Sequence, residues 1–237
     1  PDALFASALV GEGAAFVSEV DESDGSIAMF RPKIAVLNNV SLDHKSMDEL
    51  RALFGGFIGH AETAVLNLDN DETAVLASAR KGGKLAYSLN DKSADLFAEN
   101  IEPQPFGVSF DVVAKGESAR VTLKMPGRHN VSNALAAIAA ASACGVSLQA
   151  SAKALAEFEG VKRRLEYVGE AKGVTVIDDF GHNPDKITAS LKTLHEFPGR
   201  LLVMFQPHGF GPLRLMKTEF IATFTSQLAP EDVLLMP

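Results

Sequence analysis

The chain has 237 residues, of which 46% are hydrophobic and 22% are charged, and its formal net charge is −8. This composition is typical of a globular protein with one large domain or two modest ones, and the negative charge argues against a basic nucleic-acid-binding surface. No stretch is apolar for long enough to span a bilayer, and the single cysteine, Cys144, excludes an internal disulfide. Because no signal peptide is recognisable either, we expect a cytoplasmic protein without membrane or nucleic-acid partners.

Both ends of the sequence are abrupt. The chain opens with Pro1-Asp2-Ala3-Leu4 instead of a start methionine, and residues 232–236 have the pattern of a strand that is cut off. We therefore expect domains that are truncated at both ends. A fragment and a sequence from which residues have been left out both remain open.

Three short apolar runs in the first third of the chain predict strands. They cover residues 14–19, 33–37 and 63–67, and a helical segment at 47–58 separates the last two. Continuous apolar runs of this length indicate a buried parallel sheet, in which ligands bind outside the carboxyl ends of the strands. Acidic or amide residues follow each run, so we expect a site at this edge of the sheet.

In the next part of the chain, residues 85–124, the sequence predicts structural strands without candidate site residues. Short strands are predicted at residues 85–88, 97–101, 108–113 and 119–124. Apolar residues alternate with others at Val108, Phe110 and Val112, which favours a small antiparallel meander with one face in water.

A polar turn follows the last of these strands. Residues 125–133 read Met-Pro-Gly-Arg-His-Asn-Val-Ser-Asn and precede a helix of small side chains at 134–143, which should stop at Gly145. Amide groups offer a donor and an acceptor side by side, which suits a nucleotide base and ribose, and helix amino ends favour anions. The alternative is an ordinary turn capped by Asn130, with His129 on the surface.

Two charged stretches carry a second set of candidates. Glu19-Val20-Asp21-Glu22-Ser23-Asp24 is strongly acidic, and such oxygen-rich loops hold Mg²⁺ beside phosphates, although a solvated loop has the same composition. Lys162-Arg163-Arg164 follows Gly160 and could be a polar linker, but arginine forks also bind phosphate oxygens in pairs. We expect the domain boundary at this basic trio.

The last third predicts a β-α-β-α-β unit. Residues 174–179 have the pattern of a buried strand, and Asn183 followed by Pro184 is a strong helix start before residues 185–196. A further strand at 200–205, a helix at 213–228 and a strand at 233–236 complete a parallel unit. Ligands dock at the first strand-to-helix turn of such units, which here contains Asp178, Asp179 and His182.

In this order, the motifs resemble those of the Mur ligase family, the ATP-dependent ligases that add amino acids to UDP-N-acetylmuramate, and most closely its L-alanine-adding branch. That branch has Glu-Ala-Asp-Glu-Ser-Asp where this chain has residues 19–24, and Asp-Asp-Tyr-Gly-His-His-Pro where it has 178–184. The family segment Gly-x-His-Asn-x-x-Asn matches residues 127–133, and an Arg-Arg-Phe-like motif matches 163–165. Gln206-Pro207-His208 also matches that branch.

The resemblance implies a fold and a set of roles. The fold is α/β, with a central nucleotide-binding domain at residues 1–161, built on a mostly parallel sheet plus a small antiparallel meander, and a Rossmann-like C-terminal domain at 162–237. ATP and Mg²⁺ are the implied cofactors. The implied metal ligands are Glu19 and His44; the nucleotide-binding residues are His129, Asn130, Asn133, Arg163, Arg164 and Asp179; the catalytic residues are Arg164, Asp179 and His182; and the substrate-binding residues are Asn39, Phe180, His182 and His208.

Some features depart from the family. No Gly-x-x-x-x-Gly-Lys-Ser/Thr phosphate loop occurs in these residues, Phe180 stands for Tyr, and Gly209-Phe210 replaces the usual Arg-Tyr. The implied reaction is amide-bond formation through an acyl phosphate, in peptidoglycan precursor synthesis. A murein-tripeptide recycling ligase or a cyanophycin-type ligase would keep the chemistry with other substrates, and a nucleotide-binding module without turnover is the non-enzymatic alternative.

Overall fold

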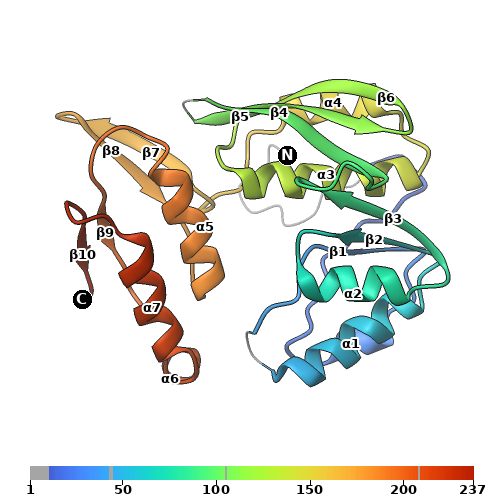
Figure 1. Ribbon diagram of the computed structural model, residues 1–237, viewed down its shortest axis with the longest axis horizontal. Helices are drawn as coiled ribbons and strands as arrows, with labels where there is room; N and C mark the ends of the chain where they lie inside the picture. The colour runs from blue at the N-terminus through green and yellow to red at the C-terminus, as the bar shows by residue number, and fades with distance from the viewer. Residues whose placement is uncertain (1–10, 43–44, 105, 208) are drawn as a thin grey trace.

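The computed structural model describes residues 11–42, 45–104, 106–207 and 209–237. The larger part is a six-stranded sheet with helices, and the smaller part holds the last third of the chain (Figure 1). Among the described residues, no helix combines the length and the apolar character that crossing a membrane requires.

One continuous sheet contains the predicted parallel strands at 33–37 and 63–67 and the predicted meander. The strand at 85–88, which was grouped with the meander, is instead parallel to both of its neighbours. The order of the sheet follows the chain; the first four strands run parallel, and each of the last two runs antiparallel to the strand before it. The strands are β1 (Ile34–Leu37), β2 (Thr63–Asn67), β3 (Gly83–Ser88), β4 (Leu96–Gln104), β5 (Gly107–Ala114) and β6 (Glu117–Leu123). The expected α/β class, with a mostly parallel sheet and an antiparallel extension, is confirmed.

Helices cover both faces of the parallel strands. In Figure 1, α1 (Met47–Gly59) and α2 (Asp71–Ala79) lie below β1–β3, and α3 (Arg128–Ala143) lies above them. Strand β2 is buried on both sides because Val65 joins the α3 core, whereas Ala64 and Leu66 join the α1–α2 core. Helix α4 (Leu148–Glu157) packs on β6, and a short 3₁₀ turn, η1 (Ser26–Met29), precedes β1.

Helix α3 begins earlier than the sequence indicated. Its first residue is Arg128 and its N-cap is Gly127, so Asn130 lies inside the first turn and is not the cap. The end agrees with the expected stop, since Gly145 has a φ of +86° and the amide of Val146 donates to the carbonyl of Ala141 at 3.0 Å. The small side chains of α3 let it lie close against the sheet.

The C-terminal part contains two small sheets. Its elements are β7 (Glu166–Ala171), β8 (Val174–Asp178), α5 (Pro184–Leu194), β9 (Leu202–Met204), α6 (Phe210–Leu215), α7 (Lys217–Gln227) and β10 (Val233–Leu235). Strands β9 and β10 are parallel, as expected, and α5 packs against α7 through Leu191, Phe220 and Phe224. The helix expected at 213–228 is divided at Met216, which is buried.

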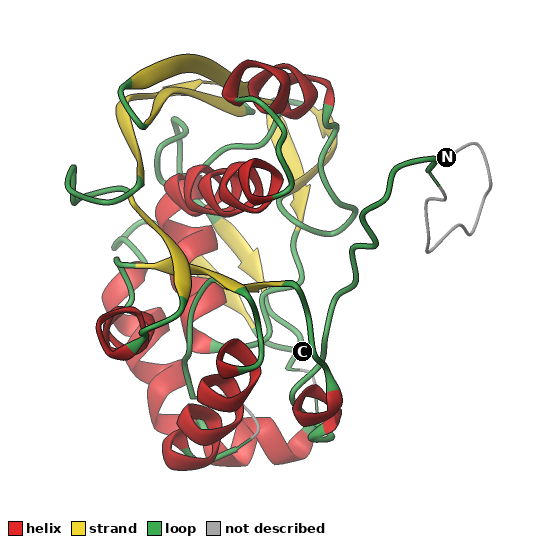
Figure 2. Ribbon diagram, turned by 90° about the vertical axis from the view of Figure 1, so that its right-hand side faces the viewer, coloured by secondary structure: helices red, strands yellow, loops and turns green. Residues whose placement is uncertain are grey.

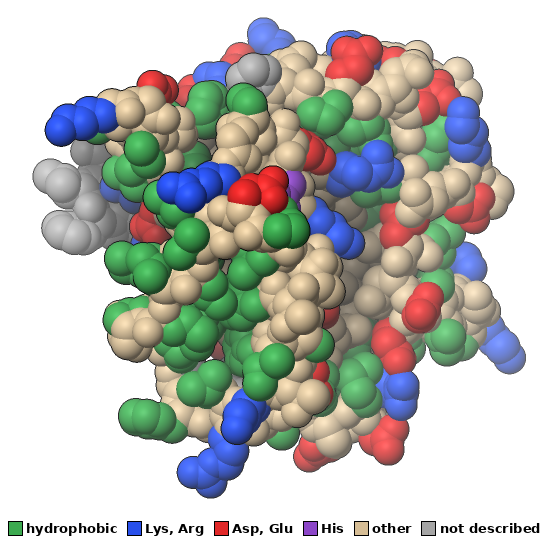
Figure 3. All heavy atoms as spheres, turned by 60° about the vertical axis from the view of Figure 1, so that its left-hand side comes forward, with side chains coloured by type: hydrophobic (Ala, Val, Ile, Leu, Met, Phe, Trp, Pro, Cys, Tyr) green, Lys and Arg blue, Asp and Glu red, His purple; other side chains and the backbone are tan. Residues whose placement is uncertain are grey.

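The strand expected to open a parallel unit forms a hairpin instead. Strand β8 pairs antiparallel with β7, and Val174 and Val176 are about half exposed, so the prediction of a buried strand at 174–179 was wrong. Lys172 and Gly173 both have positive φ, 52° and 75°, which is the geometry of a tight two-residue hairpin turn. Such a local hairpin costs little loop-closure entropy. Figure 3 brings this side of the molecule forward and shows apolar side chains spread over it.

The strand expected at residues 14–19 was also wrong. This segment is a loop in which Phe16 and Val17 are 94% and 91% exposed, and Figure 2 shows it running out from the body. Apolar residues form a strand only when a neighbouring strand supplies hydrogen bonds and a face to pack on, and β1 pairs on one side with β2.

Candidate active site

The carboxyl ends of the first three strands meet the beginning of α3. The hydroxyl of Tyr87, from β3, donates to Asn38 Oδ1 at 3.1 Å, and Asn38 Nδ2 donates to Asn133 Oδ1 at 3.4 Å. Asn67, at the end of β2, donates to the backbone carbonyl of Asn38 at 2.9 Å. The predicted edge of the sheet therefore does collect polar side chains, and one of them is Asn133, a predicted nucleotide contact.

Asn38 lies at the centre of this network, although the sequence pointed to its neighbour Asn39. The side chain of Asn38 is half-buried and hydrogen-bonded, whereas Asn39 is exposed. Alternation along β1, where Val36 is exposed and Leu37 is buried, would have placed Asn39 on the buried face, so the local pattern gave no signal for Asn38.

Tyr87 is fully buried beneath this network. Burial raises the pKa of the Tyr87 phenol well above its ordinary value of 10.0, and a hydrogen bond from Ser132 opposes that rise. The hydroxyl therefore keeps its proton at neutral pH and remains a donor. Tyr87 belongs to no recognised motif, and its buried position was visible only in the fold.

Within the protein, Asn130 is hydrogen-bonded and His129 is largely buried. The side-chain amide of Asn130 donates to the carbonyl of Pro126 at 2.7 Å, which fixes the turn before α3. His129 is largely buried, and this burial lowers its pKa, while the negative charge of Asp179 acts in the opposite direction. His129 and Asp179 come from different parts of the chain, so the structure brings together two residues that the sequence had only named separately.

Asp179 accepts hydrogen bonds from two separate segments of the C-terminal part. Its Oδ1 accepts from the backbone amide of Leu165 at 3.0 Å, and its Oδ2 accepts from the hydroxyl of Ser190 at 2.7 Å. Leu165 has a φ of 49° and ends the linker between the two parts. A carboxylate held by two donors is well oriented, but both of its oxygens are already hydrogen-bonded.

The arginine pair surrounds Phe180. Arg164 donates to the backbone carbonyl of Phe180 at 3.1 Å, and the guanidinium groups of Arg163 and Arg164 lie 4.9 and 5.6 Å from the Phe180 ring centroid. A phenyl ring attracts such cations without neutralising them. Arg163 Nε also lies 3.6 Å from Asp178 Oδ2, so this ion pair partly offsets the charge of Arg163.

His182 belongs to the same cluster. Its ring centroid lies 5.0 Å from that of Phe180, its Nδ1 is 3.3 Å from the Phe180 carbonyl oxygen, and its Nε2 is 3.0 Å from Lys186 Nζ. Of the catalytic residues expected from the sequence, Asp179 and His182 thus lie in the turn between β8 and α5. Arg164 lies before β7 and reaches this turn through its hydrogen bond to Phe180.

The expected metal ligands are not brought together in the described residues. Glu19 lies in the exposed loop, and His44, like the predicted substrate contact His208, lies outside the described residues. In the described part of the chain, no group of three or more His, Cys, Asp or Glu side chains could hold a metal ion. Asp21 and Asp24 accept from the backbone amides of Ser23 and Ser26 at 2.7 and 2.8 Å, so these two carboxylates shape the loop.

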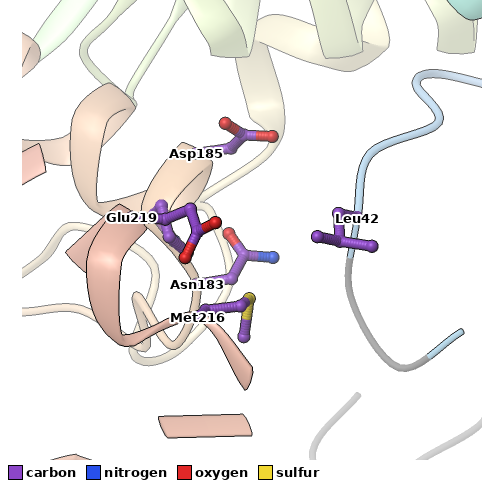
Figure 4. Close-up of a pocket in the computed structure, with 6 residues that line it drawn as sticks. Leu42, Asn183, Asp185, Met216 and Glu219 are labelled. Atoms are coloured by element: carbon purple, nitrogen blue, oxygen red, sulfur yellow. The ribbon is translucent and has the colours of Figure 1, made fainter. Parts of the chain in front are cut away.

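A cavity of about 220 Å³ separates the loop after β1 from the C-terminal part. Figure 4 shows Leu42 on one side and Asn183, Met216 and Glu219 on the other. Its lining residues are Leu42, Asn183, Pro184, Asp185, Met216 and Glu219. Met216 is the N-cap of α7 and Glu219 lies in its first turn; neither was anticipated, because neither belongs to a motif.

Family models match both parts of the chain. The model of the Mur ligase middle domain covers residues 3–141, and that of the Mur ligase glutamate ligase domain covers residues 163–236. These two matches account for most of the described elements, including β1 to α3 in the first and β7 to β10 in the second.

Curated relatives are UDP-N-acetylmuramate–L-alanine ligases. The chain is 37% identical over 235 residues to the enzyme of Acaryochloris marina, which covers 92% of this chain and 48% of that protein. It is 39% identical over 220 residues to the enzyme of Streptomyces coelicolor, covering 89% of this chain and 48% of that protein. The chain thus spans about half the length of the curated relatives it matches.

Solved structures agree on the fold. MurF from Acinetobacter baumannii superposes with a TM-score of 0.75 at 25% identity, over 90% of this chain and 48% of that one. UDP-N-acetylmuramate-alanine ligase MurC from Thermotoga maritima gives a TM-score of 0.69 at 24% identity, over 92% of this chain and 54% of that one, which is evidence for the fold alone. The sequence matches to both parts, together with the shared fold, establish that this chain belongs to the Mur ligase family.

Proposed function

We propose that this chain forms the nucleotide-binding and acceptor-binding parts of an ATP-dependent ligase that joins an amino acid to the carboxylate of UDP-N-acetylmuramate. L-Alanine is the first candidate acceptor, because the relatives with 37% and 39% identity are named UDP-N-acetylmuramate–L-alanine ligases. The proposed route is an acyl phosphate on the muramyl carboxylate, which the amine of the amino acid then attacks. This reaction belongs to peptidoglycan precursor synthesis.

The observation that carries the proposal is the electrostatic interaction between His129 and Asp179, which come from the two parts of the chain. These residues belong to the two family motifs expected around the nucleotide, and the charge of Asp179 acts on the buried His129 ring. Asn133 lies one turn along α3 and is exposed at the edge of the sheet. A nucleotide held at this edge would thus contact groups from both parts of the chain.

The residues present fit a nucleotide and its phosphates. Asn133 offers an exposed amide for the base or ribose, and the charged guanidinium of Arg164 would attract phosphate oxygens. ATP, when bound, supplies the phosphoryl group that activates the muramyl carboxylate. Around that group, Arg163 and Arg164 would offset developing negative charge, which is the main contribution a protein makes to phosphoryl transfer.

Mg²⁺ fits the chemistry of Glu19, although other donors must join it. A single carboxylate with water and phosphate oxygens is a common magnesium site. Glu19 is exposed and lies in a loop outside the sheet, so its carboxylate is free to approach the phosphates. His44 and Asn39 would serve the metal and the sugar nucleotide, respectively.

Two departures favour a second candidate acceptor. Phe180 lacks the hydroxyl of the family's tyrosine, and Gly209 lacks the guanidinium of its arginine. Both changes remove hydrogen-bond donors on the side where the incoming amino acid should bind. A murein tripeptide or another amino acid is therefore the alternative acceptor, and a cyanophycin-type ligase or a module that binds nucleotide without turnover would follow if no acceptor works.

The experiment is phosphate release by the complete gene product with ATP, Mg²⁺ and UDP-N-acetylmuramate, screening L-alanine, other amino acids and the murein tripeptide. Release with L-alanine is the expected result. Release with another acceptor alone would make Phe180 and Gly209 the specificity residues. Without release for any acceptor, the proposed ligase activity would be wrong, and retained ATP binding would then favour the non-catalytic module.

Replacing Glu19 tests the metal assignment. We expect Glu19→Ala in the complete protein to abolish ligation and leave the thermal unfolding midpoint unchanged, because the side chain is exposed. Glu12→Ala removes a carboxylate from the same exposed segment and is the matched control, with normal turnover expected. Near-normal turnover of Glu19→Ala would exclude Glu19 as a metal ligand.

A further inference from the structure

The polar network at the sheet edge forms a ring, in which two links are hydrogen bonds, one is the interaction of Ser132 with Tyr87 and the last is the peptide chain. It leaves α3 at Ser132, passes to Tyr87 on β3 and to Asn38 after β1, and returns to α3 at Asn133. Ser132 and Asn133 are neighbours in sequence. Each step of the ring therefore constrains the next.

The direction of the hydrogen bonds around this ring follows from the chemistry of its members. A phenol has one proton, and Tyr87 gives it to Asn38 Oδ1. The Asn38 amide then has its NH₂ group directed to Asn133 Oδ1. With its oxygen occupied by this donor, Asn133 directs its own NH₂ group away from the ring.

The anchor of the ring is rigid. Tyr87 is fully buried, and the backbone of Asn38 is held by the Asn67 amide at 2.9 Å. Asn133, by contrast, is exposed on the surface of α3. An exposed amide without a fixed neighbour can rotate by 180° and exchange its donor and acceptor, whereas this one is restrained through a buried hydroxyl.

We infer that Tyr87 and Asn38 are positioning residues that orient the Asn133 amide, so that it presents N–H donors to a hydrogen-bond acceptor of the bound nucleotide. This inference rests on the proposed function, in which Asn133 contacts ATP. Tyr87 and Asn38 act through Asn133 and do not contact the ligand themselves. Their effect should therefore appear in nucleotide binding and not in the chemical step.

Removing the Tyr87 hydroxyl tests the inference in the complete protein. Tyr87→Phe keeps the buried ring, and we expect the KM for ATP to rise about threefold to tenfold while kcat stays within about twofold, because a net hydrogen bond is lost. Tyr167→Phe is the matched control, since Tyr167 is the other tyrosine of the chain and is 50% exposed. Its KM for ATP should not change.

A double-mutant cycle separates positioning from a general structural effect. In an Asn133→Ala background, Tyr87→Phe should leave the KM for ATP unchanged, because the residue through which it acts is absent. If Tyr87→Phe folds poorly, Asn38→Ala breaks the ring at a half-buried position and should give the same KM effect and the same lack of additivity.

The outcomes distinguish this inference from the proposed function. An unchanged KM in Tyr87→Phe and Asn38→Ala, with a raised KM in Asn133→Ala, would overturn the positioning role alone. Fully additive effects would also overturn it. A wild-type protein that neither binds ATP nor releases phosphate would overturn the proposed function and the inference together.

Discussion

His129 has an environment that determines how its charge responds to pH. Burial lowers the pKa of His129 below its ordinary value of 6.5, and the charge of Asp179 partly offsets this effect. The folded protein therefore binds a proton on His129 less readily than the unfolded chain. It follows that this residue's contribution to stability is complete above pH 6.5 and is lost as the pH falls below that value.

The first prediction concerns the His129–Asp179 pair. We expect Asp179→Asn to lower the pKa of His129 further, because the negative charge that raises it is removed. Titration of the His129 ring signals by NMR measures this shift. Ser190→Ala is the control, since it removes a hydrogen bond to Asp179 but keeps the charge. A raised pKa of His129 in Asp179→Asn would contradict this electrostatic interaction.

Gly127 allows the two parts of the chain to approach each other. Its φ is +95°, and a Cβ there would lie 2.4 Å from Thr193 Oγ1 and 2.8 Å from His129 Cε1. We expect Gly127→Ala to lower the free energy of unfolding by at least about 1–3 kcal/mol, from backbone strain plus these contacts. Gly116→Ala is the control in denaturant unfolding, because Gly116 has a φ of +80° with nothing within 4 Å of its Cβ. Equal losses for both variants would show that the close approach at Gly127 has no effect.

At the scale of elements, the start of α5 was predicted correctly from the sequence, whereas that of α3 was placed too late. Asn183 caps α5 by accepting from the amide of Lys186 at 2.9 Å, Pro184 is in the first turn, and Ser147 caps α4 in the same way at 3.2 Å. Capping and the fixed φ of proline act within a few residues, so the sequence contains all the information that these starts require.

The caps give a prediction on helix stability. Asn183 is 4% exposed, and we expect Asn183→Ala to cost about 1–2 kcal/mol, which would speed hydrogen exchange of the α5 amides about 5-fold to 30-fold. Ser147→Ala, at an exposed cap, is the comparison and should affect α4 by no more than this. Unchanged exchange in α5 would mean that Asn183 stabilises the helix start only weakly.

At the scale of the whole molecule, an aromatic contact joins the two parts. The ring of Phe106, in the turn between β4 and β5, lies 4.9 Å from that of Tyr167 on β7 and 5.4 Å from that of Phe197 after α5. Aromatic pairs contribute about 0.5–1.5 kcal/mol beyond the area they bury. Together with Gly127 and Thr193, these rings fix how the C-terminal part sits against the sheet.

Phe106→Ala should loosen this arrangement. We expect faster proteolytic cleavage in the linker at residues 159–162, by about the factor that two lost ring contacts imply, roughly 5-fold to 100-fold. Phe210→Ala is the control, because Phe210 is 90% exposed and should not affect cleavage. Equal cleavage rates in Phe106→Ala and the unaltered chain would show that the rings do not hold the two parts together.

Strands were predicted correctly from the sequence where their burial determines their pattern of apolar residues. The run at 63–67 is buried on both faces and was read with its correct limits, and the meander of β4–β6 was visible in its alternation. The runs at 14–19 and 174–179 have equally apolar patterns, yet one is a loop and the other is half-exposed in a hairpin. Strand formation depends on a neighbouring strand with which to pair, and the apolar pattern of a segment does not show whether such a neighbour is present.

The sequence by itself determined the family motifs, the Asn183 cap and the strands β1 and β2, because each depends on residues close together in the chain. Only the tertiary structure decided that Tyr87 and Asn38 form a hydrogen-bonded chain to Asn133. It also decided that the charge of Asp179 acts on His129 and that Phe106 joins the two parts. These contacts join residues far apart in sequence. Their geometry depends on how the sheet and its helices pack, which no local pattern specifies.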